Sequence, residues 1–146
     1  MIYVIVSSIL FLDQLTKFLA TKSLSLNQSV PIIKGILHLT LIHNRGAAFG
    51  ILKNQIPFFI FTSILAIILI YFNLKDVYHK RYYVYNLSLS LILAGALGNL
   101  IDRLFLGYVI DFLDFRIWPV FNIADSAITI GAILLGYSIL KLKGKS

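Results

Sequence analysis

The stretch from Ile56 to Phe72 reads IPFFIFTSILAIILIYF and contains no charged residue. A run of this kind is close to the ~20 residues that a helix needs to cross ~30 Å of hydrocarbon. Three further apolar stretches lie at residues 2–20, 84–101 and 121–142. The 146-residue chain is 59% hydrophobic, more than a soluble domain of this size could bury. The sequence therefore predicts an all-α integral membrane protein with four transmembrane helices, in one domain covering residues 1–146.

The first apolar stretch resembles a secretory signal, but no basic residue precedes it, and Asp13 and Lys17 interrupt its end. We therefore expect it to be retained. The absence of cysteine excludes disulfides, thiolate nucleophiles and cysteine-based metal sites. The pI of about 9.7 would suit a nucleic-acid-binding protein. The basic residues lie at the ends of apolar stretches and in loops, however, as membrane anchors do, so we expect no nucleic-acid partner.

Two clusters of basic residues predict the orientation in the membrane. One follows the second apolar stretch and the other lies in the C-terminal tail. Because Lys and Arg concentrate on the cytoplasmic side, we expect both clusters and both termini in the cytoplasm. The first loop and the connection between the third and fourth stretches then face outward; the basic residues of the first loop are spread thinly over a long segment, where the rule is weak. The clusters comprise Lys75, Lys80, Arg81, Lys141, Lys143 and Lys145.

The first loop has a pattern of its own. Residues 36–42 read ILHLTLI and alternate leucines with His38 and Thr40, which predicts a strand with one apolar face in a small sheet on the membrane. Residues 44–50 read NRGAAFG, and their small residues permit tight turns and the close approach of another chain. An ordinary turn before the next helix explains this second segment equally well.

Polar residues also occur within the predicted helices. Asp13 and Lys17 are four residues apart, so they share a helix face, and a structural ion pair is the favoured interpretation. Asn99, Asp102 and Arg103 share a face at the end of the third helix. There Arg103 could hold Asp102 as a fixed carboxylate or offer donors to a peptide carbonyl.

The third helix also carries small residues at a spacing that permits close helix packing, at Ala94 and Gly98. The face that carries them is therefore expected to point into the bundle.

All six acidic residues are aspartates, and four of them, Asp102, Asp111, Asp114 and Asp125, lie close together near the third connection. Asn122 precedes Asp125 by three residues just before an apolar run, which is typical of a helix N-terminal cap. The short connection from Asp111 could also fold back and bring Asp111 and Asp125 together. Two carboxylates at a poorly solvated boundary share one proton, which is the arrangement of an aspartic protease.

Other hydrolytic chemistries find less support. The histidines, His38, His43 and His79, show no metal-binding spacing such as HExxH, and His79 lies on the predicted cytoplasmic side. The sequence contains no Gly-x-Ser-x-Gly elbow and no Gly-x-Gly-Asp motif. A serine and lysine dyad stays open, although the outer loops offer no persuasive pair. We therefore expect no metallopeptidase.

Five motifs lie in order along nearly the whole chain: DQLTK at 13–17, NRGAAF at 44–49, GNLIDR at 98–103, VIDF at 109–112 and FNIADSA at 121–127. Together they resemble the motif set of bacterial lipoprotein signal peptidase, or signal peptidase II. The resemblance implies cleavage of prolipoproteins just before their diacylglyceryl-modified cysteine, in the bacterial cytoplasmic membrane, without a cofactor. It further implies membrane lipids as partners and sensitivity to globomycin.

The resemblance also assigns roles to residues. It implies that Asp111 and Asp125 are the catalytic pair, a choice over Asp102 that composition and spacing leave open. The connection between the pair is compact for the family, and Asp114 receives no role. The resemblance implies substrate contacts for Asn44, Asn99, Arg103 and Asn122, and supporting positions for Asp13 and Lys17; we expect Asp102 to support the site by bracing Arg103 and the end of the third helix.

Two other functions account for part of the sequence. A small transporter or channel component could use Asp13, Lys17 and Asp102 to relay ions or protons. This alternative explains the polar helix faces, but not the Asn-x-x-Asp patterns or the outer loop. A noncatalytic membrane assembly factor explains no specific residue.

Overall fold

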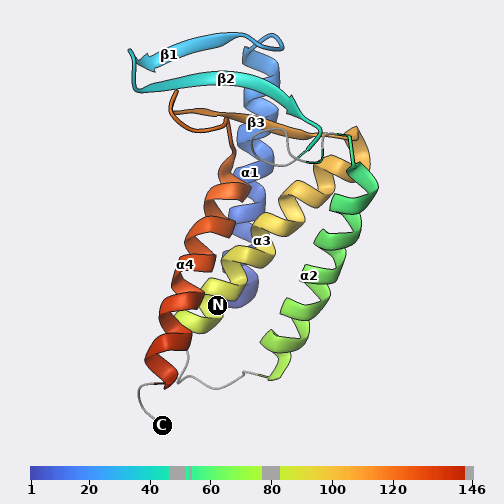
Figure 1. Ribbon diagram of the computed structural model, residues 1–146, viewed down its shortest axis with the longest axis vertical. Helices are drawn as coiled ribbons and strands as arrows, with labels where there is room; N and C mark the ends of the chain where they lie inside the picture. The colour runs from blue at the N-terminus through green and yellow to red at the C-terminus, as the bar shows by residue number, and fades with distance from the viewer. Residues whose placement is uncertain (47–51, 53, 77–82, 144–146) are drawn as a thin grey trace.

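The computed structural model shows a bundle of four helices with a three-stranded sheet at one end (Figure 1). It describes residues 1–46, 52, 54–76 and 83–143. Four helices in these ranges are long and apolar enough to cross a membrane, which confirms the predicted fold class. The elements in order are α1 (Ile2–Ser23), β1 (Ser29–Ile33), β2 (Leu37–Asn44), α2 (Ile56–Asp76), α3 (Tyr83–Leu106), β3 (Val109–Asp114) and α4 (Ile123–Lys143).

The first three helices extend beyond the apolar stretches that predicted them, because a helix can continue from hydrocarbon into the polar boundary. α3 runs past Ile101 to Leu106. It ends before Gly107, which has φ +74° and donates its backbone N–H to the carbonyl of Arg103 at 3.2 Å. A glycine adopts this left-handed conformation without strain, so the chain can leave the helix and enter β3 at once.

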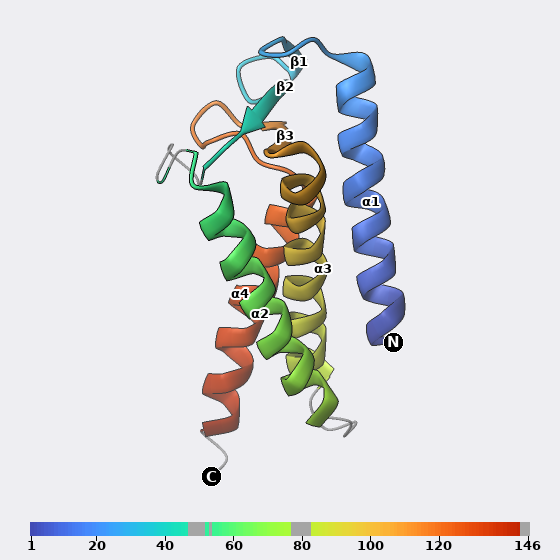
Figure 2. The same cartoon turned by 90° about the vertical axis from the view of Figure 1, so that its right-hand side faces the viewer.

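α3 contacts each of the other three helices and lies between α1 on one side and α2 and α4 on the other (Figure 2). Small residues permit these contacts. Ala94 is fully buried. A Cβ at Gly98 would come within 2.5 Å of the Asp13 carboxylate of α1, and one at Gly131 of α4 would come within 2.7 Å of the Ser88 carbonyl of α3. The predicted close packing through Ala94 and Gly98 is therefore confirmed.

α1 attaches to the bundle mainly through polar groups. Its only buried residues are Asp13, Lys17 and Ala20, whereas large apolar side chains such as Tyr3 and Phe11 are exposed. Apolar residues on the outside of a membrane helix face lipid, so the bundle interior can concentrate the polar residues.

The sheet has the strand order β1-β2-β3, with both pairs antiparallel. β2 corresponds to the strand predicted at residues 36–42, whereas β1 and β3 were not predicted. Ile42 pairs with Asp111 and Asn44 pairs with Val109, after an irregularity between Leu39 and Ile42. Buried apolar residues join the sheet to α1 in one cluster, which contains Ala20, Leu41, Ile110 and Phe112.

The connection from β3 to α4 folds back on β3, as expected. Phe121 donates its N–H to the Leu113 carbonyl at 3.0 Å, and its own carbonyl accepts the N–H groups of Phe112 and Leu113. This bridge places the start of α4 beside the middle of β3. The expected turn at residues 44–50 is described only as far as Gly46; residues 47–50, the basic residues Lys80 and Arg81, and Lys145 lie outside the described ranges.

Candidate active site

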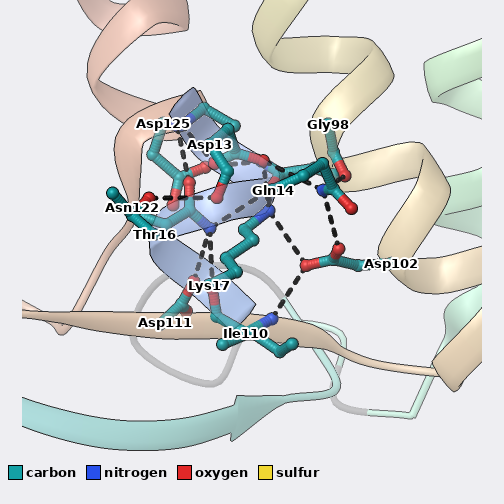
Figure 3. Close-up of polar contacts among 12 residues, drawn as sticks. Asp13, Gln14, Thr16, Lys17, Gly98, Asp102, Ile110, Asp111, Asn122 and Asp125 are labelled. Carbon is teal, nitrogen blue, oxygen red and sulfur yellow. Dashed lines mark hydrogen bonds and ion pairs between the residues drawn. The ribbon is translucent and has the colours of Figure 1, made fainter. Parts of the chain in front are cut away.

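Asp111 and Asp125 lie on different elements at the sheet end of the bundle (Figure 3). Asp111 is in the middle of β3 and is 1% exposed. Its Oδ1 accepts the side-chain amide of Asn122 at 2.7 Å, and its Oδ2 accepts that of Asn44 at 2.8 Å. Asp125, in the first turn of α4, is half-buried, and its Oδ1 accepts the amide of Asn99 at 2.7 Å. Three asparagines thus surround the two aspartates.

The orientation of each asparagine amide is fixed by a group that can only donate. The Oδ1 of Asn122 accepts the backbone N–H of Asp125 at 2.8 Å. The Oδ1 of Asn44 accepts the backbone N–H of Gly46 at 2.9 Å, and that of Asn99 accepts the Lys17 ammonium at 3.1 Å. Each side-chain NH₂ group therefore points toward a carboxylate. This arrangement suits a site that carries negative charge.

The sequence left open whether Asn122 caps a helix or belongs to a site that joins Asp111 and Asp125, and the structure shows both contacts. It caps α4, because its side-chain oxygen accepts the N–H of Asp125 in the first turn. Its amide nitrogen simultaneously lies within hydrogen-bonding distance of Asp111 Oδ1, of Asn99 Oδ1 at 3.1 Å and of the Ile110 carbonyl at 3.2 Å. The helix cap is thus part of the carboxylate site.

The pKa of Asp111 is raised to about 7. Burial is the largest cause, and the negative charge of Asp125 adds to it. The amides of Asn44 and Asn122 and the charge of Lys17 oppose the rise. Near neutral pH the pair therefore holds a proton that an isolated aspartate would have lost.

A second polar cluster lies next to the pair, centred on Lys17. Its ammonium forms ion pairs with Asp13 at 2.8 Å, as predicted, and with Asp102 at 2.9 Å. Gln14 donates to Asp102 at 3.1 Å, and Asp102 also accepts the backbone N–H of Ile110 at 3.0 Å. Asp102 therefore joins α1, α3 and β3.

The expectation that Asp102 holds Arg103 is wrong: among the described residues the ion-pair partner of Asp102 is Lys17. The two side chains leave α3 in different directions. The Arg103 guanidinium lies over the ring of Phe59 on α2, 5.0 Å from its centroid. The Arg103 guanidinium therefore lies between α2 and α3, where it lines the cavity described below.

A cavity of about 510 Å³ opens between α2, α3, α4 and the connection before α4. Its polar lining consists of Asn44, Asn99, Arg103 and Asp125, whereas Asp111 and Asn122 are buried and do not line it. Away from the carboxylates the lining is mostly apolar, with residues such as Phe59, Ala96 and Ile128. The cavity is thus polar and charged at one end and mostly apolar elsewhere.

Asp114, for which no role was predicted, fixes the loop after β3. Its Oδ2 accepts the Thr40 hydroxyl at 2.7 Å and the Arg116 guanidinium at 3.1 Å, and its Oδ1 accepts the backbone N–H of Arg116 at 2.8 Å. Burial alone would raise its pKa, but these hydrogen bonds and the charge of Arg116 lower it. An aspartate whose carboxylate accepts the backbone N–H two residues later is typical of a turn, so Asp114 at the end of the strand was the sequence signal for this loop.

Taken together, four helices able to span a membrane and two aspartates at one end, Asp125 lining a cavity and Asp111 buried, define a polytopic membrane protein with an acidic site. The profile of the family described as "Signal peptidase (SPase) II" matches residues 5–141. The chain belongs to this family of peptidases, which remove signal peptides from prolipoproteins.

Similar proteins support the same assignment. The chain is 52% identical over 142 residues to the lipoprotein signal peptidase of Caldanaerobacter subterraneus subsp. tengcongensis, covering 96% of both chains. It is 49% identical over 136 residues to that of Halothermothrix orenii, covering 92% of both. Nothing in these similarities supports a transporter or channel.

Solved structures agree with the fold. One, titled a bacterial membrane enzyme structure at 2.3 Å resolution, has a TM-score of 0.87 and 35% sequence identity, covering 99% of this chain and 90% of that one. Another, at 1.9 Å resolution, has a TM-score of 0.84 and 36% identity, covering 96% and 92%.

Proposed function

We propose that this peptidase is of the aspartic type, and that Asp111 and Asp125 are its catalytic pair. It cleaves a diacylglyceryl prolipoprotein just before the lipidated cysteine. The observation that carries this proposal is the geometry around the pair: Asp125 faces the cavity, Asp111 is buried with a pKa raised to about 7, and Asn122 lies between them.

The chemistry needs one carboxylate and one carboxylic acid. The carboxylate takes a proton from water as the water attacks the scissile carbonyl, and the acid polarises that carbonyl and later protonates the leaving amine. The raised pKa of Asp111, caused by burial and by the charge of Asp125, supports a shared proton near neutral pH. The pair acts as a unit, and acid–base chemistry of this kind requires no cofactor.

The cavity supports the substrate class. A prolipoprotein can diffuse in the plane of the bilayer and enter between the helices while its acyl chains stay in lipid. The apolar lining beyond the carboxylates, with Phe59 and Ile128, suits the membrane-embedded part of such a substrate. Prior anchoring to the membrane also lowers the entropic cost of reaching the site.

Polar groups at the cavity end hold the peptide. Asn44, Asn99 and Arg103 line the cavity and contact the backbone carbonyls of the extended substrate, and Asn122 orients Asp111 from behind. Asp13, Lys17 and Asp102 support this arrangement from the adjacent ion-pair cluster. Globomycin binds in the same cavity and blocks it.

The protein lies in the bacterial cytoplasmic membrane with both termini in the cytoplasm and the carboxylate pair at the outer face. The basic residues of the C-terminal tail support this orientation. Because the chain contains no cysteine, single cysteines can be introduced at Ser29 and at Ser146 without background. A membrane-impermeant thiol reagent added to intact cells should label the first and not the second; the reverse pattern would overturn the orientation.

The catalytic assignment is tested with purified protein and a diacylated prolipoprotein in detergent. The wild type should release a shortened product, and globomycin should block it. Asp125→Asn should abolish cleavage while keeping the bond from Asn99 through its amide oxygen, and Asp111→Asn should also abolish it. Asp114→Asn, on the same strand as Asp111, serves as the matched control: it should retain kcat, and any effect of its loop contacts should fall on KM. Full activity in either dyad variant would overturn the aspartic mechanism.

A further inference from the structure

The most completely enclosed positive charge in the described part of the chain belongs to Lys17, which is 1% exposed within a membrane-spanning helix. An ammonium group has three N–H donors. Here they meet three oxygens: Asp13 Oδ2 at 2.8 Å, Asp102 Oδ2 at 2.9 Å and Asn99 Oδ1 at 3.1 Å. Two contacts are ion pairs, but the third goes to a neutral amide that itself touches the catalytic pair.

Asn99 connects Lys17 to the carboxylates. Its oxygen accepts the ammonium, so its NH₂ group must face the other way, toward Asp125, where it donates at 2.7 Å. With the amide reversed, Asn99 would place an oxygen against the Asp125 carboxylate and an NH₂ group against the ammonium, and both contacts would be repulsive. Lys17, together with the Asn122 amide 3.1 Å from the same oxygen, therefore determines which end of the Asn99 amide faces Asp125.

We infer that Lys17 is a positioning residue of the reaction, which fixes the Asn99 amide as a donor to Asp125 and supplies a positive charge beside the carboxylate pair. This inference rests on the proposed function, since it concerns the same site. A purely structural ion pair would need Asp13 and Asp102 alone. The third contact, to Asn99, is what links the cluster to the chemistry.

The charge of Lys17 also acts on the pair directly. It lowers the pKa of Asp111, against the larger effects of burial and of Asp125. Lys17, and not Asp13, is among the larger charges that shift the pKa of Asp111. The charged or titratable groups around Asp111 are Asp13 and Lys17 of α1, Asp102 and Arg103 of α3, Asp125 of α4, His43 of β2 and Arg45 just after β2.

The experiment uses two charge-balanced double variants of the full chain. Lys17→Met with Asp13→Asn removes both the charge and the donors. Lys17→Gln with Asp13→Asn removes the charge but keeps a donor for Asn99. The amide oxygen that Asp13→Asn introduces can still accept the Ala124 N–H, and Asp102 keeps Gln14 and the Ile110 N–H as partners. Lys22→Met is the matched control, since Lys22 is exposed on the same helix.

The readouts are kcat, KM and the pH profile of kcat/KM with a synthetic diacylglyceryl prolipoprotein. The Met variant should lose kcat by about ten- to a hundredfold, the effect of one charge-assisted hydrogen bond, with little change in KM. The Gln variant should recover part of kcat. In both variants the alkaline limb of the kcat/KM profile should move to higher pH, because the pKa of Asp111 rises once the Lys17 ammonium is gone. Lys22→Met should match the wild type.

A folded double variant with wild-type kcat and an unmoved alkaline limb would overturn the role of Lys17 and leave the aspartic mechanism intact. Where the Met variant yields no folded protein, the alkaline limb of the Gln variant decides alone. Failure of the proposed function has a different signature, namely activity that survives in Asp111→Asn or Asp125→Asn.

Discussion

Asn122 is the N-terminal cap of α4, and its side-chain amide donates to Asp111 Oδ1 at 2.7 Å. The same side chain accepts the backbone N–H of Asp125 at 2.8 Å. One residue thus begins a membrane helix and holds one carboxylate beside the other. Helix formation and site assembly are coupled here, and substitutions can separate them.

Asn122→Ser keeps a side-chain oxygen for the cap but removes the amide donor to Asp111. We expect cleavage to fall by about tenfold or more, the effect of one hydrogen bond to a charged group. The melting temperature in detergent should change less than in Asn122→Ala, which also loses the cap, worth about 1 kcal/mol. Equal activity in Asn122→Ser and wild type would show that Asn122 acts only as a cap.

The pH dependence of cleavage follows from Asp111. Its pKa of about 7 is raised partly by the charge of Asp125, so it corresponds to loss of the second proton from the pair. The singly protonated pair is the working form, and kcat/KM should therefore decline as pH rises above about 7. A profile that stays flat well above this pH would contradict the shared proton.

The same pKa predicts how stability changes with pH. The native state holds the Asp111 proton more tightly than the unfolded state does, so this residue makes stability fall as pH rises from its ordinary pKa of 3.8 to about 7. Asp111→Asn removes the titrating group and should flatten this part of the curve. Thermal unfolding of both proteins at several pH values between these limits provides the measurement, and parallel curves would contradict the prediction.

Gly98 and Gly136 form a matched pair of helical glycines. A Cβ at Gly98 would come within 2.5 Å of the Asp13 carboxylate, whereas one at Gly136 would meet nothing within 4 Å. Gly98→Ala should destabilise the protein by about 1–3 kcal/mol through overpacking. Gly136→Ala should be neutral or stabilise by about 0.5 kcal/mol, because alanine favours a helix. The two melting temperatures in one detergent test the difference, and similar values would contradict the packing of α1 on α3.

Thr40 connects β2 to the loop after β3 through Asp114. Thr40→Val should loosen this loop, which carries the cavity residues Trp118 and Phe121, and should therefore raise KM more than it lowers kcat. Thr21→Val is the control, because Thr21 is exposed and its hydroxyl donates to the Phe18 carbonyl of its own helix. An unchanged KM in Thr40→Val would show that the tether does not shape the cavity.

The sequence predicts the helices well because an uninterrupted apolar stretch is a direct consequence of spanning lipid. It also predicts the Asp13 and Lys17 pair and the Asn122 cap, since both depend on spacing within one helix. The strand β3 was missed because Asp111 and Asp114 interrupt its apolar residues, and both are buried through tertiary contacts. β1 was missed because it contains Pro31 and every residue in it is exposed.

The spacing of residues along one helix could not predict the contacts between helices. Lys17 contacts Asp102 and Asn99 on α3, and these contacts depend on how α1 is aligned against α3. For the same reason the sequence favoured the neighbouring Arg103 as the partner of Asp102. The resemblance to a family, and not the pattern of charge, selected Asp111.

The polar attachment of α1 has a consequence for how the protein is made. Asp13 and Lys17 are synthesised first, yet Asp102 lies on α3, and the backbone N–H that Asp13 accepts belongs to Ala124, 111 residues later in the chain. The opening helix therefore enters the bilayer with a charged pair whose other partners do not yet exist. Its final docking must wait for α4, so the carboxylate site closes only after α4 has been made.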